Sequence, residues 1–182
     1  MKPILQVEDD TNDVILLEHA MKSAGVTNPV QVVNDGRQAI DYLQGAGKYG
    51  DREQYPMPCL VLLDLKLPYV MGLDVLKWIR QQIGTELVVV MLTASAEEAD
   101  IRTAYRWGAN AFLTKPSEAS KLDDMLRALK DFWLTYNTLP RESFERMTAA
   151  KQVDSRTTLF GYLPSRNGAD QEASFTKKAV NE

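Results

Sequence analysis

The chain has 182 residues, more than the roughly 100–150 of a typical domain, so we expect one domain with an extension. Its 21 basic and 25 acidic residues give a net charge of −4, which argues against a nucleic-acid-binding surface as the main output. One cysteine excludes an intrachain disulfide, and no apolar run approaches the ~20 residues that span a bilayer, so we expect a cytoplasmic protein that does not enter a membrane.

Short apolar runs alternate with helical periodicities along most of the chain, which is typical of a parallel α/β sheet. In chain order the pattern predicts a strand at 4–7, a helix from about 11 to 24, a strand at 30–33, a helix at 36–44 and a polar loop at 45–58. It then predicts a strand at 59–63, a helix from 72 to about 82, a strand at 87–92, a helix from about 97 to 107 and a strand at 111–114.

The last predicted helix carries more aromatic side chains than one sheet edge needs. It begins near Ser117, which we expect to be its N-cap, and its apolar positions keep the three-and-four spacing of a buried stripe. These positions are Leu122, Met125, Leu126, Leu129, Phe132, Trp133 and Tyr136. We interpret most of the stripe as core and its aromatic end as a surface for a partner.

The composition changes near Leu139-Pro140, where the sequence becomes polar and mixed in charge. We therefore expect one domain at 1–137 and a polar extension at 138–182 that is partly disordered. Within the extension, the spacing at 141–151 predicts a short helix with Phe144 and Met147 on one side.

Polar residues follow four of the predicted strands at their carboxyl ends. They are Glu8, Asp9 and Asp10 after the first strand, Asp64 after the third, Thr93 after the fourth and Lys115 after the fifth. Ligands of open α/β sheets bind outside the carboxyl ends of the strands. Carboxylates, a hydroxyl and an ammonium group at that edge predict a site for a divalent metal and a phosphoryl group.

One glycine-rich pattern in the sequence resembles a nucleotide-binding motif but lacks the context that such a motif needs. Gly45, Gly47 and Gly50 have the spacing of a dinucleotide-binding fingerprint, but that fingerprint needs a strand before it and a helix after it. Here the glycines follow a helix and precede a polar loop. We do not expect a nucleotide cofactor.

The strand-end residues together resemble a known family. Over residues 2–137 the chain resembles the receiver domain of two-component response regulators, on the strength of Glu8-Asp9, Asp64, Thr93-Ala94, Lys115-Pro116 and five alternating β/α units. The loop at 45–58 and the Phe132-Trp133-Leu134 ending are similar to small regulators paired with bacterial phytochrome kinases. The resemblance implies a flavodoxin-like receiver fold, a five-stranded parallel sheet with strand order 2-1-3-4-5 and helices on both faces.

The resemblance also implies a chemistry. Asp64 would accept a phosphoryl group from a histidine kinase, so the chain would be a phosphoacceptor rather than an enzyme, although one able to catalyse its own phosphorylation and dephosphorylation. Mg²⁺ would be held by Asp9 and Asp64 directly, by the backbone carbonyl of Lys66, and by Glu8 through water. Lys115 would place a cation on the other side of the phosphoryl group.

Two further residues would carry the signal away from the site. Thr93 would donate its hydroxyl to a phosphoryl oxygen, and Phe112 matches the aromatic residue that moves when the family switches state. The output face would be formed by the helix at 97–107, the strand at 111–114 and the last helix. We expect this face to mediate self-association, and a phytochrome-type kinase to be the upstream partner. The resemblance also implies a cis peptide bond before Pro116.

The chain departs from the family pattern at two positions. Lys66 stands two residues after Asp64, where an ammonium group would weaken metal binding, and Asp10 adds a third consecutive acid that would offset it. For Asp13, near the start of the first helix, we favour the simple interpretation that an acid stabilises the positive end of the helix dipole.

Two other functions compete with the switch. A haloacid-dehalogenase-type hydrolase also uses a strand-end aspartate and Mg²⁺, but it needs a general acid two residues later, where this chain has Lys66. A phosphorylation-independent scaffold with a receiver fold would not need Asp9, Asp64, Thr93 and Lys115 all present. Whether the switch drives an output, relays its phosphate or drains a shared kinase stays open at this point.

Overall fold

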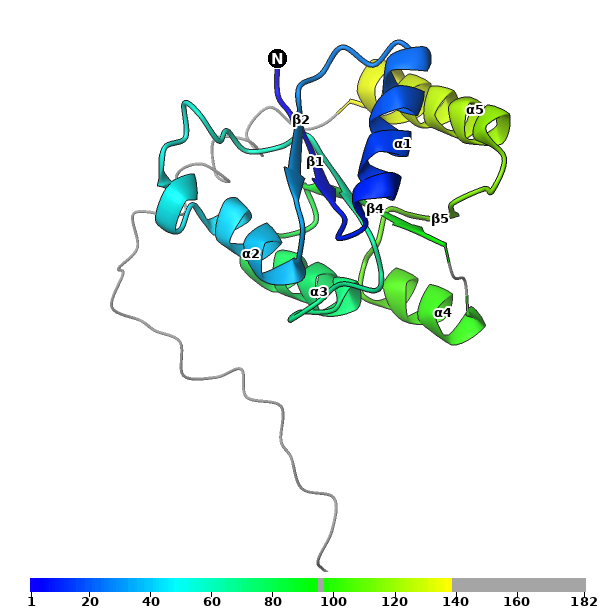
Figure 1. Cartoon of the computed structure of the whole chain (residues 1–182). Helices are drawn as coiled ribbons and strands as arrows, with labels where there is room; N and C mark the ends of the chain where they lie inside the picture. The colour runs from blue at the N-terminus through cyan, green and yellow to red at the C-terminus, as the bar shows by residue number, and fades with distance from the viewer. Residues whose placement is uncertain (95–96, 139–182) are drawn as a thin grey trace, which may run out of the picture. The chain divides into compact units, whose positions relative to one another are not determined.

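The computed structural model describes residues 1–94 and 97–138, and its centre is a parallel sheet (Figure 1). The strands are β1 (Ile4–Val7), β2 (Val30–Val33), β3 (Leu60–Leu63), β4 (Val88–Thr93) and β5 (Ala111–Thr114). They lie in the order β2-β1-β3-β4-β5, which confirms the predicted order. Val7 pairs with both Val33 and Leu63, so the last residues of β2, β1 and β3 stand in one row. The carboxyl ends of the strands therefore share one edge, which we call the carboxyl edge, and their beginnings share the amino edge.

Five α-helices cover the two faces of the sheet. They are α1 (Thr11–Ser23), α2 (Gly36–Gln44), α3 (Gly72–Gln82), α4 (Glu98–Arg106) and α5 (Ala119–Leu129). A 3-10 turn, η1 (Gly47–Gly50), follows α2, and a π-helix, η2 (Lys130–Tyr136), continues α5. In Figure 1, α1 and α5 lie on one side of the sheet and α2 and α3 on the other. The sequence prediction placed every strand and α-helix to within two residues at each end, apart from the end of the last helix.

Each face of the sheet has its own apolar core. Because side chains alternate along a strand, Leu5 and Val7 face α2 and α3, whereas Ile4 faces α1 and α5. The strands β1, β3 and β4 are buried along their whole length, as expected for a parallel sheet covered on both faces. This burial fixes where the strands end, and so fixes the side chains that follow them.

The guanidinium groups of two half-buried arginines connect elements at the amino edge. Arg80, in the last turn of α3, donates to the carbonyl oxygens of Gly108 at 2.8 Å and Leu87 at 2.9 Å and to Asn110 Oδ1 at 2.8 Å. Asn110 Oδ1 also accepts the amide of Val89 in β4 at 2.8 Å. The end of α3 is thereby joined to the starts of β4 and β5.

Arg52 has a similar role beside α2. Its guanidinium donates to the carbonyl oxygens of Tyr42 at 2.8 Å and Leu43 at 2.8 Å, which are among the carbonyls that the end of a helix leaves unpaired. The hydroxyl of Tyr42 donates to the Pro56 carbonyl at 2.8 Å, and the Tyr42 ring packs edge-on against Tyr55. The polar loop predicted at 45–58 is therefore an ordered part of the amino edge.

The π-helix changes which side chains the end of α5 exposes. Leu122, Leu126 and Leu129 are buried as predicted, and Trp133 packs against the core. Phe132 and Tyr136 are exposed, at 58% and 78%, so they are surface rather than core. A π turn adds a residue to the helical repeat, which rotates the apolar stripe away from the sheet.

Two expectations are wrong. Ser117 is not the N-cap of α5, because the helix begins at Ala119 after Glu118 and lacks a side-chain cap. The peptide bond before Pro116 is trans, since the described residues contain no cis bond, and the two forms differ little in energy before proline. The extension predicted at 138–182, apart from Thr138, lies outside the described residues, as does its predicted helix at 141–151. No helix in the described ranges has the length and apolar character to cross a bilayer.

Candidate phosphoacceptor and metal site

Three carboxylates meet at the carboxyl edge, next to the ends of β1 and β3. Glu8, Asp9 and Asp64 each offer an oxygen within 4.8 Å of the others. The sheet places them: the Glu8 amide donates to the Val33 carbonyl at 3.0 Å, and the Asp64 amide donates to the Val7 carbonyl at 3.1 Å. These bonds extend the strand ladders by one residue, so both carboxylates are held by backbone. Glu8 and Asp64 are buried and Asp9 is exposed, which leaves the group open on one side.

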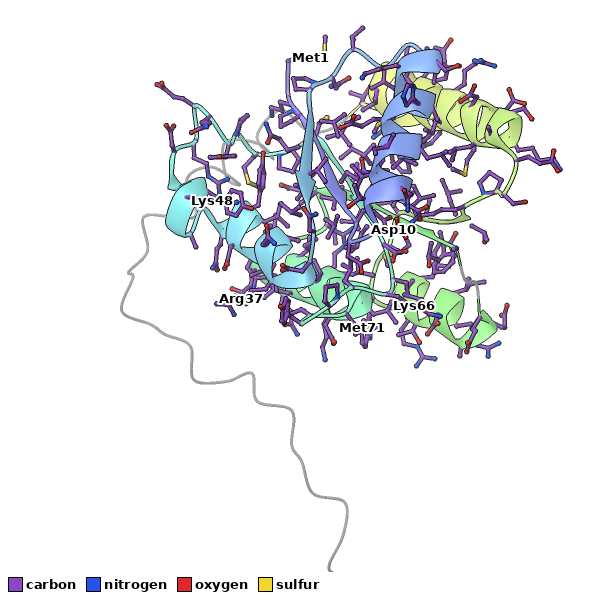
Figure 2. The ribbon with its side chains drawn as sticks, in the orientation of Figure 1. Met1, Asp10, Arg37, Lys48, Lys66 and Met71 are labelled. Carbon is purple, nitrogen blue, oxygen red and sulfur yellow. The ribbon has the colours of Figure 1, made fainter. Side chains whose placement is uncertain are left out.

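Asp10 is not part of this group. It is the N-cap of α1, and its Oδ1 accepts the amide of Asn12 at 2.7 Å. Figure 2 shows Asp10 where the chain leaves β1 for α1, and Lys66 at the same end of the sheet, opposite Met1. The third consecutive acid therefore serves the helix, and its predicted compensation of Lys66 has no support in the contacts of its carboxylate.

Lys115 faces the carboxylates from β5. Its Nζ lies 2.5 Å from Glu8 Oε2, 2.7 Å from Asp13 Oδ2 and 3.9 Å from Asp64 Oδ1. The side chain is 12% exposed, and the Lys115 amide is fixed by a 2.8 Å bond to the Thr93 carbonyl. The predicted neighbourhood of Lys115 and Asp64 is thus confirmed, but the shortest contacts of the ammonium are with two other acids.

Burial and charge shift two pKa values at this edge. Burial raises the pKa of Glu8, and the charge of Asp64 adds to that rise, whereas the hydrogen bond and charge of Lys115 lower it. For Lys115, burial alone would lower the pKa, but hydrogen bonds with Asp13 and Glu8 and the charges of Glu8 and Asp64 outweigh burial and raise it. Each group thus favours the charged form of the other, although burial keeps the pKa of Glu8 above its ordinary value.

The loop between β3 and α3, residues 65–71, packs closely against Asp64. The Lys66 amide donates to Asp64 Oδ2 at 3.1 Å, while the Lys66 side chain is exposed. Gly72 begins α3 so near the strand that a Cβ there would lie 1.9 Å from the Asp64 carbonyl oxygen. Tyr69, in the same loop, has a φ of 64° and is 90% exposed. Glycine at 72 is therefore required for the loop to return beside Asp64.

The two predicted switch residues stand on β4 and β5. Thr93 ends β4 and is 2% exposed, and it pairs in the sheet with Thr114. Phe112 pairs with Met91, is half-buried and packs against the core shared with α2 and α3. Ala94, directly after Thr93, is exposed and leaves the approach to this edge open.

This donor set fits a hard divalent cation. Carboxylate and carbonyl oxygens are the ligands that Mg²⁺ prefers, and Mg²⁺ keeps several waters, so few protein ligands suffice. Glu8, Asp13 and Asp64 lie within 4 Å of Lys115 Nζ, and Asp9 lies beside Glu8 and Asp64, so this group of described residues has more negative than positive charge. The residue that sequence reasoning missed is Asp13, whose contact joins residues 102 positions apart. The only local signal was its position in the first turn of the helix that follows the strand-end acids.

Comparisons with known proteins agree with this geometry. A family model described as "Response regulator receiver domain" matches residues 4–127. "Response regulator Rcp1" of Synechocystis is 36% identical over 140 residues, which cover 76% of this chain and 93% of that protein.

Two solved structures have the same fold. The Mn(2+)-bound form of response regulator Rcp1 is 36% identical and has a TM-score of 0.69, covering 77% of this chain and 99% of that chain. The phosphorylated cyanobacterial phytochrome response regulator RcpA is 35% identical and has a TM-score of 0.70, covering 76% of this chain and 98% of that chain.

Proposed function

The chain belongs to the response regulator receiver domain family of two-component signalling, and we propose that it is a switch activated by phosphorylation of Asp64. A histidine kinase would be the donor. The observation that carries the proposal is the convergence of the Glu8, Asp9 and Asp64 carboxylates within 4.8 Å of one another, with the Lys115 ammonium 3.9 Å from Asp64. The relative RcpA is described as phosphorylated, and the relative Rcp1 as bound to Mn²⁺, which supports both the modification and a divalent metal.

The proposed transfer forms one bond and breaks one. A carboxylate oxygen of Asp64 attacks the phosphorus of a phosphohistidine, the phosphorus–nitrogen bond breaks, and the imidazole keeps the electron pair. Mg²⁺, when bound, would neutralise charge on the transferring group. Asp9 and Asp64 would hold it directly, with the Lys66 carbonyl, and Glu8 would act through water.

The chain's own residues would supply the rest. Lys115 would contact the phosphoryl group from β5, and Thr93 would donate its hydroxyl to it from β4. Movement of Thr93 towards the site would free space for Phe112, which packs against the neighbouring core. The signal would then be carried by protein contact at the face formed by α4, β5 and α5.

The modified residue is tested by mass spectrometry. Incubation with Mg²⁺ and acetyl phosphate should add one phosphoryl group to the intact chain, and Asp64→Asn should abolish the adduct. Asp35→Asn is a matched control, because Asp35 is 7% exposed like Asp64 and also follows a strand at this edge. Labelling of Asp64→Asn as fast as wild type would reject the assignment.

The hydrolase alternative is weakened by the structure of the loop. The position two residues after Asp64 holds Lys66, whose side chain is exposed, and not the aspartate that serves as general acid in such a hydrolase. We propose a phosphoacceptor rather than a hydrolase. Slow loss of the phosphate, rather than turnover of an added phosphomonoester, is the expected behaviour.

We also propose that the output surface mediates homodimer formation and that residues 138–182 form an extension outside the receiver domain. Phe132 and Tyr136 support the first point, because their exposed rings extend this face along η2. Replacing both by serine should convert dimer to monomer in sedimentation experiments. Deleting residues 138–182 should leave folding and labelling intact. A truncated chain that labels but is monomeric would place the dimer contact in the extension.

A further inference from the structure

Lys115 is held by two acids of different exposure. Glu8 has a side chain that is 6% exposed, and the side chain of Asp13 is 38% exposed. Both contact Nζ within 2.7 Å, whereas Asp64, the proposed phosphoacceptor, is 3.9 Å away. In this arrangement the Lys115 ammonium contacts Glu8 and Asp13, neither of which is the proposed phosphoacceptor.

The helix dipole does not account for this contact. Asp13 lies in the first turn of α1, where an acid is favourable, and its amide is also 3.4 Å from Asp10 Oδ1. A dipole role requires only that the carboxylate be near the helix start. It does not require the 2.7 Å bond to an ammonium on β5.

We propose that Asp13 is a positioning residue that holds Lys115 in its resting place and releases it when Asp64 carries a phosphoryl group. This inference rests on the proposed function. An ammonium group has three donors and exchanges partners readily. Glu8 would keep its contact, because a buried carboxylate that loses its cation is costly. Asp13 would give up its contact, because solvent can hydrate it.

Open space lies beside the bond between Asp13 and Lys115. A pocket of about 330 Å³ is lined by Asp13, Lys115, Ala94 and Ser117. Both partners of this bond therefore border a solvent-sized space on one side. It follows that Asp13 opposes formation of the phosphorylated state, since that state must first break the bond between Asp13 and Lys115.

Affinity for a phosphoryl analogue measures this opposition. We expect Asp13→Asn to bind beryllium trifluoride in the presence of Mg²⁺ roughly three- to tenfold more tightly than wild type. Glu18→Gln removes the same charge further along α1 and is the control for general electrostatics. In a Lys115→Met background, Asp13→Asn should give no gain. An equal gain with and without Lys115 would show that Asp13 acts by simple charge repulsion, and would overturn the proposal.

A second measurement does not depend on phosphorylation. In metal-free protein, Lys115 should react with acetic anhydride several-fold faster in Asp13→Asn than in wild type or Glu18→Gln, as followed by peptide mass spectrometry. An unchanged rate would overturn the positioning role. If wild type fails to bind the analogue, the proposed function fails, and the acylation rate still decides whether Asp13 holds Lys115.

Discussion

The two edges of the sheet hold cations in opposite ways. At the amino edge, Arg80 donates to the oxygens of Gly108, Leu87 and Asn110, and none of these three partners carries a charge. At the carboxyl edge, Lys115 contacts the carboxylates of Glu8 and Asp13. Both residues are half-buried, so burial alone does not distinguish the two edges.

The difference between neutral and charged partners indicates which edge contributes more to stability. Backbone carbonyls are fixed in place, and they must be paired when buried, so Arg80 has a structural task. Carboxylates crowded around one ammonium repel one another and can exchange partners, so the carboxyl edge gains when a metal or phosphoryl group arrives. Stability is concentrated at one edge, and ligand response at the other.

The strongest test of this comparison removes Arg80. Arg80→Met keeps the apolar stem but removes the guanidinium donor from the carbonyls of Gly84, Gly108 and Leu87 and from Asn110 Oδ1. We expect a loss of about 3 kcal/mol in the free energy of unfolding. Arg102→Met is the control, because Arg102 is exposed and its ion pair with Glu98 should contribute less than about 0.5 kcal/mol. Urea unfolding measures both. Equal losses would mean that the amino edge is not a stability centre.

The next test adds Mg²⁺ to the carboxyl edge. The ion should stabilise wild type by about 2.7 kcal/mol once its free concentration is roughly 100 times the Kd. Asp9→Ala should lose most of that gain, because it removes one of three converging carboxylates, and Lys66→Asn should keep or increase it. Asp124→Ala, at an exposed position on α5, is the control at equal ionic strength. A full gain in Asp9→Ala would place the metal elsewhere.

The smallest expected effect is a pH dependence at the amino edge. Burial raises the pKa of Tyr42 from 10.0 to about 12. The unfolded chain therefore loses this proton first, so the contribution of Tyr42 to stability is full below pH 10.0 and is lost as pH rises towards about 12. The loss should be roughly 2 kcal/mol or less, and Tyr42→Phe should remove it.

The measurement is urea unfolding in steps from about pH 9 to about pH 12, which spans the titration of tyrosine. Tyr105→Phe is the control, because Tyr105 is 53% exposed. Other groups titrate in this range in all three proteins, so the difference between their pH profiles is the informative quantity. The same profile in Tyr42→Phe and wild type would contradict the assignment.

Most of the fold could be predicted from the sequence, because the patterns that mark strands and helices are local or periodic. Continuous apolar runs identified the buried strands, and the strand ends then identified Glu8, Asp64 and Thr93 as neighbours. The contact between Asp13 and Lys115 was not predictable in the same way. It depends on how the first turn of α1, fixed by the Asp10 cap, is placed relative to β5.

The other misses have similar causes. Ser117 is a favourable N-cap residue by type, but α5 begins two residues later, after Glu118, and without a side-chain cap. The exposure of Phe132 and Tyr136 depends on a change from α to π winding that residue spacing does not signal. The roles of Arg52, in a polar loop, and Arg80, in the last turn of a helix, were missed because an arginine at such a position is usually exposed to solvent.

The Asn110 side chain makes the backbone amide of Val89 a reporter of more than one element. Its Oδ1 accepts both the Val89 amide of β4 and a nitrogen of Arg80 from α3. Breaking the hydrogen bond between the Val89 amide and Asn110 Oδ1 therefore disturbs the contacts that join α3, β4 and the start of β5, and not only one hydrogen bond of the sheet. In hydrogen–deuterium exchange, the Val89 amide should exchange only when α3, β4 and the start of β5 separate from one another in a single opening event. Its exchange rate therefore measures the cooperative opening of the amino edge.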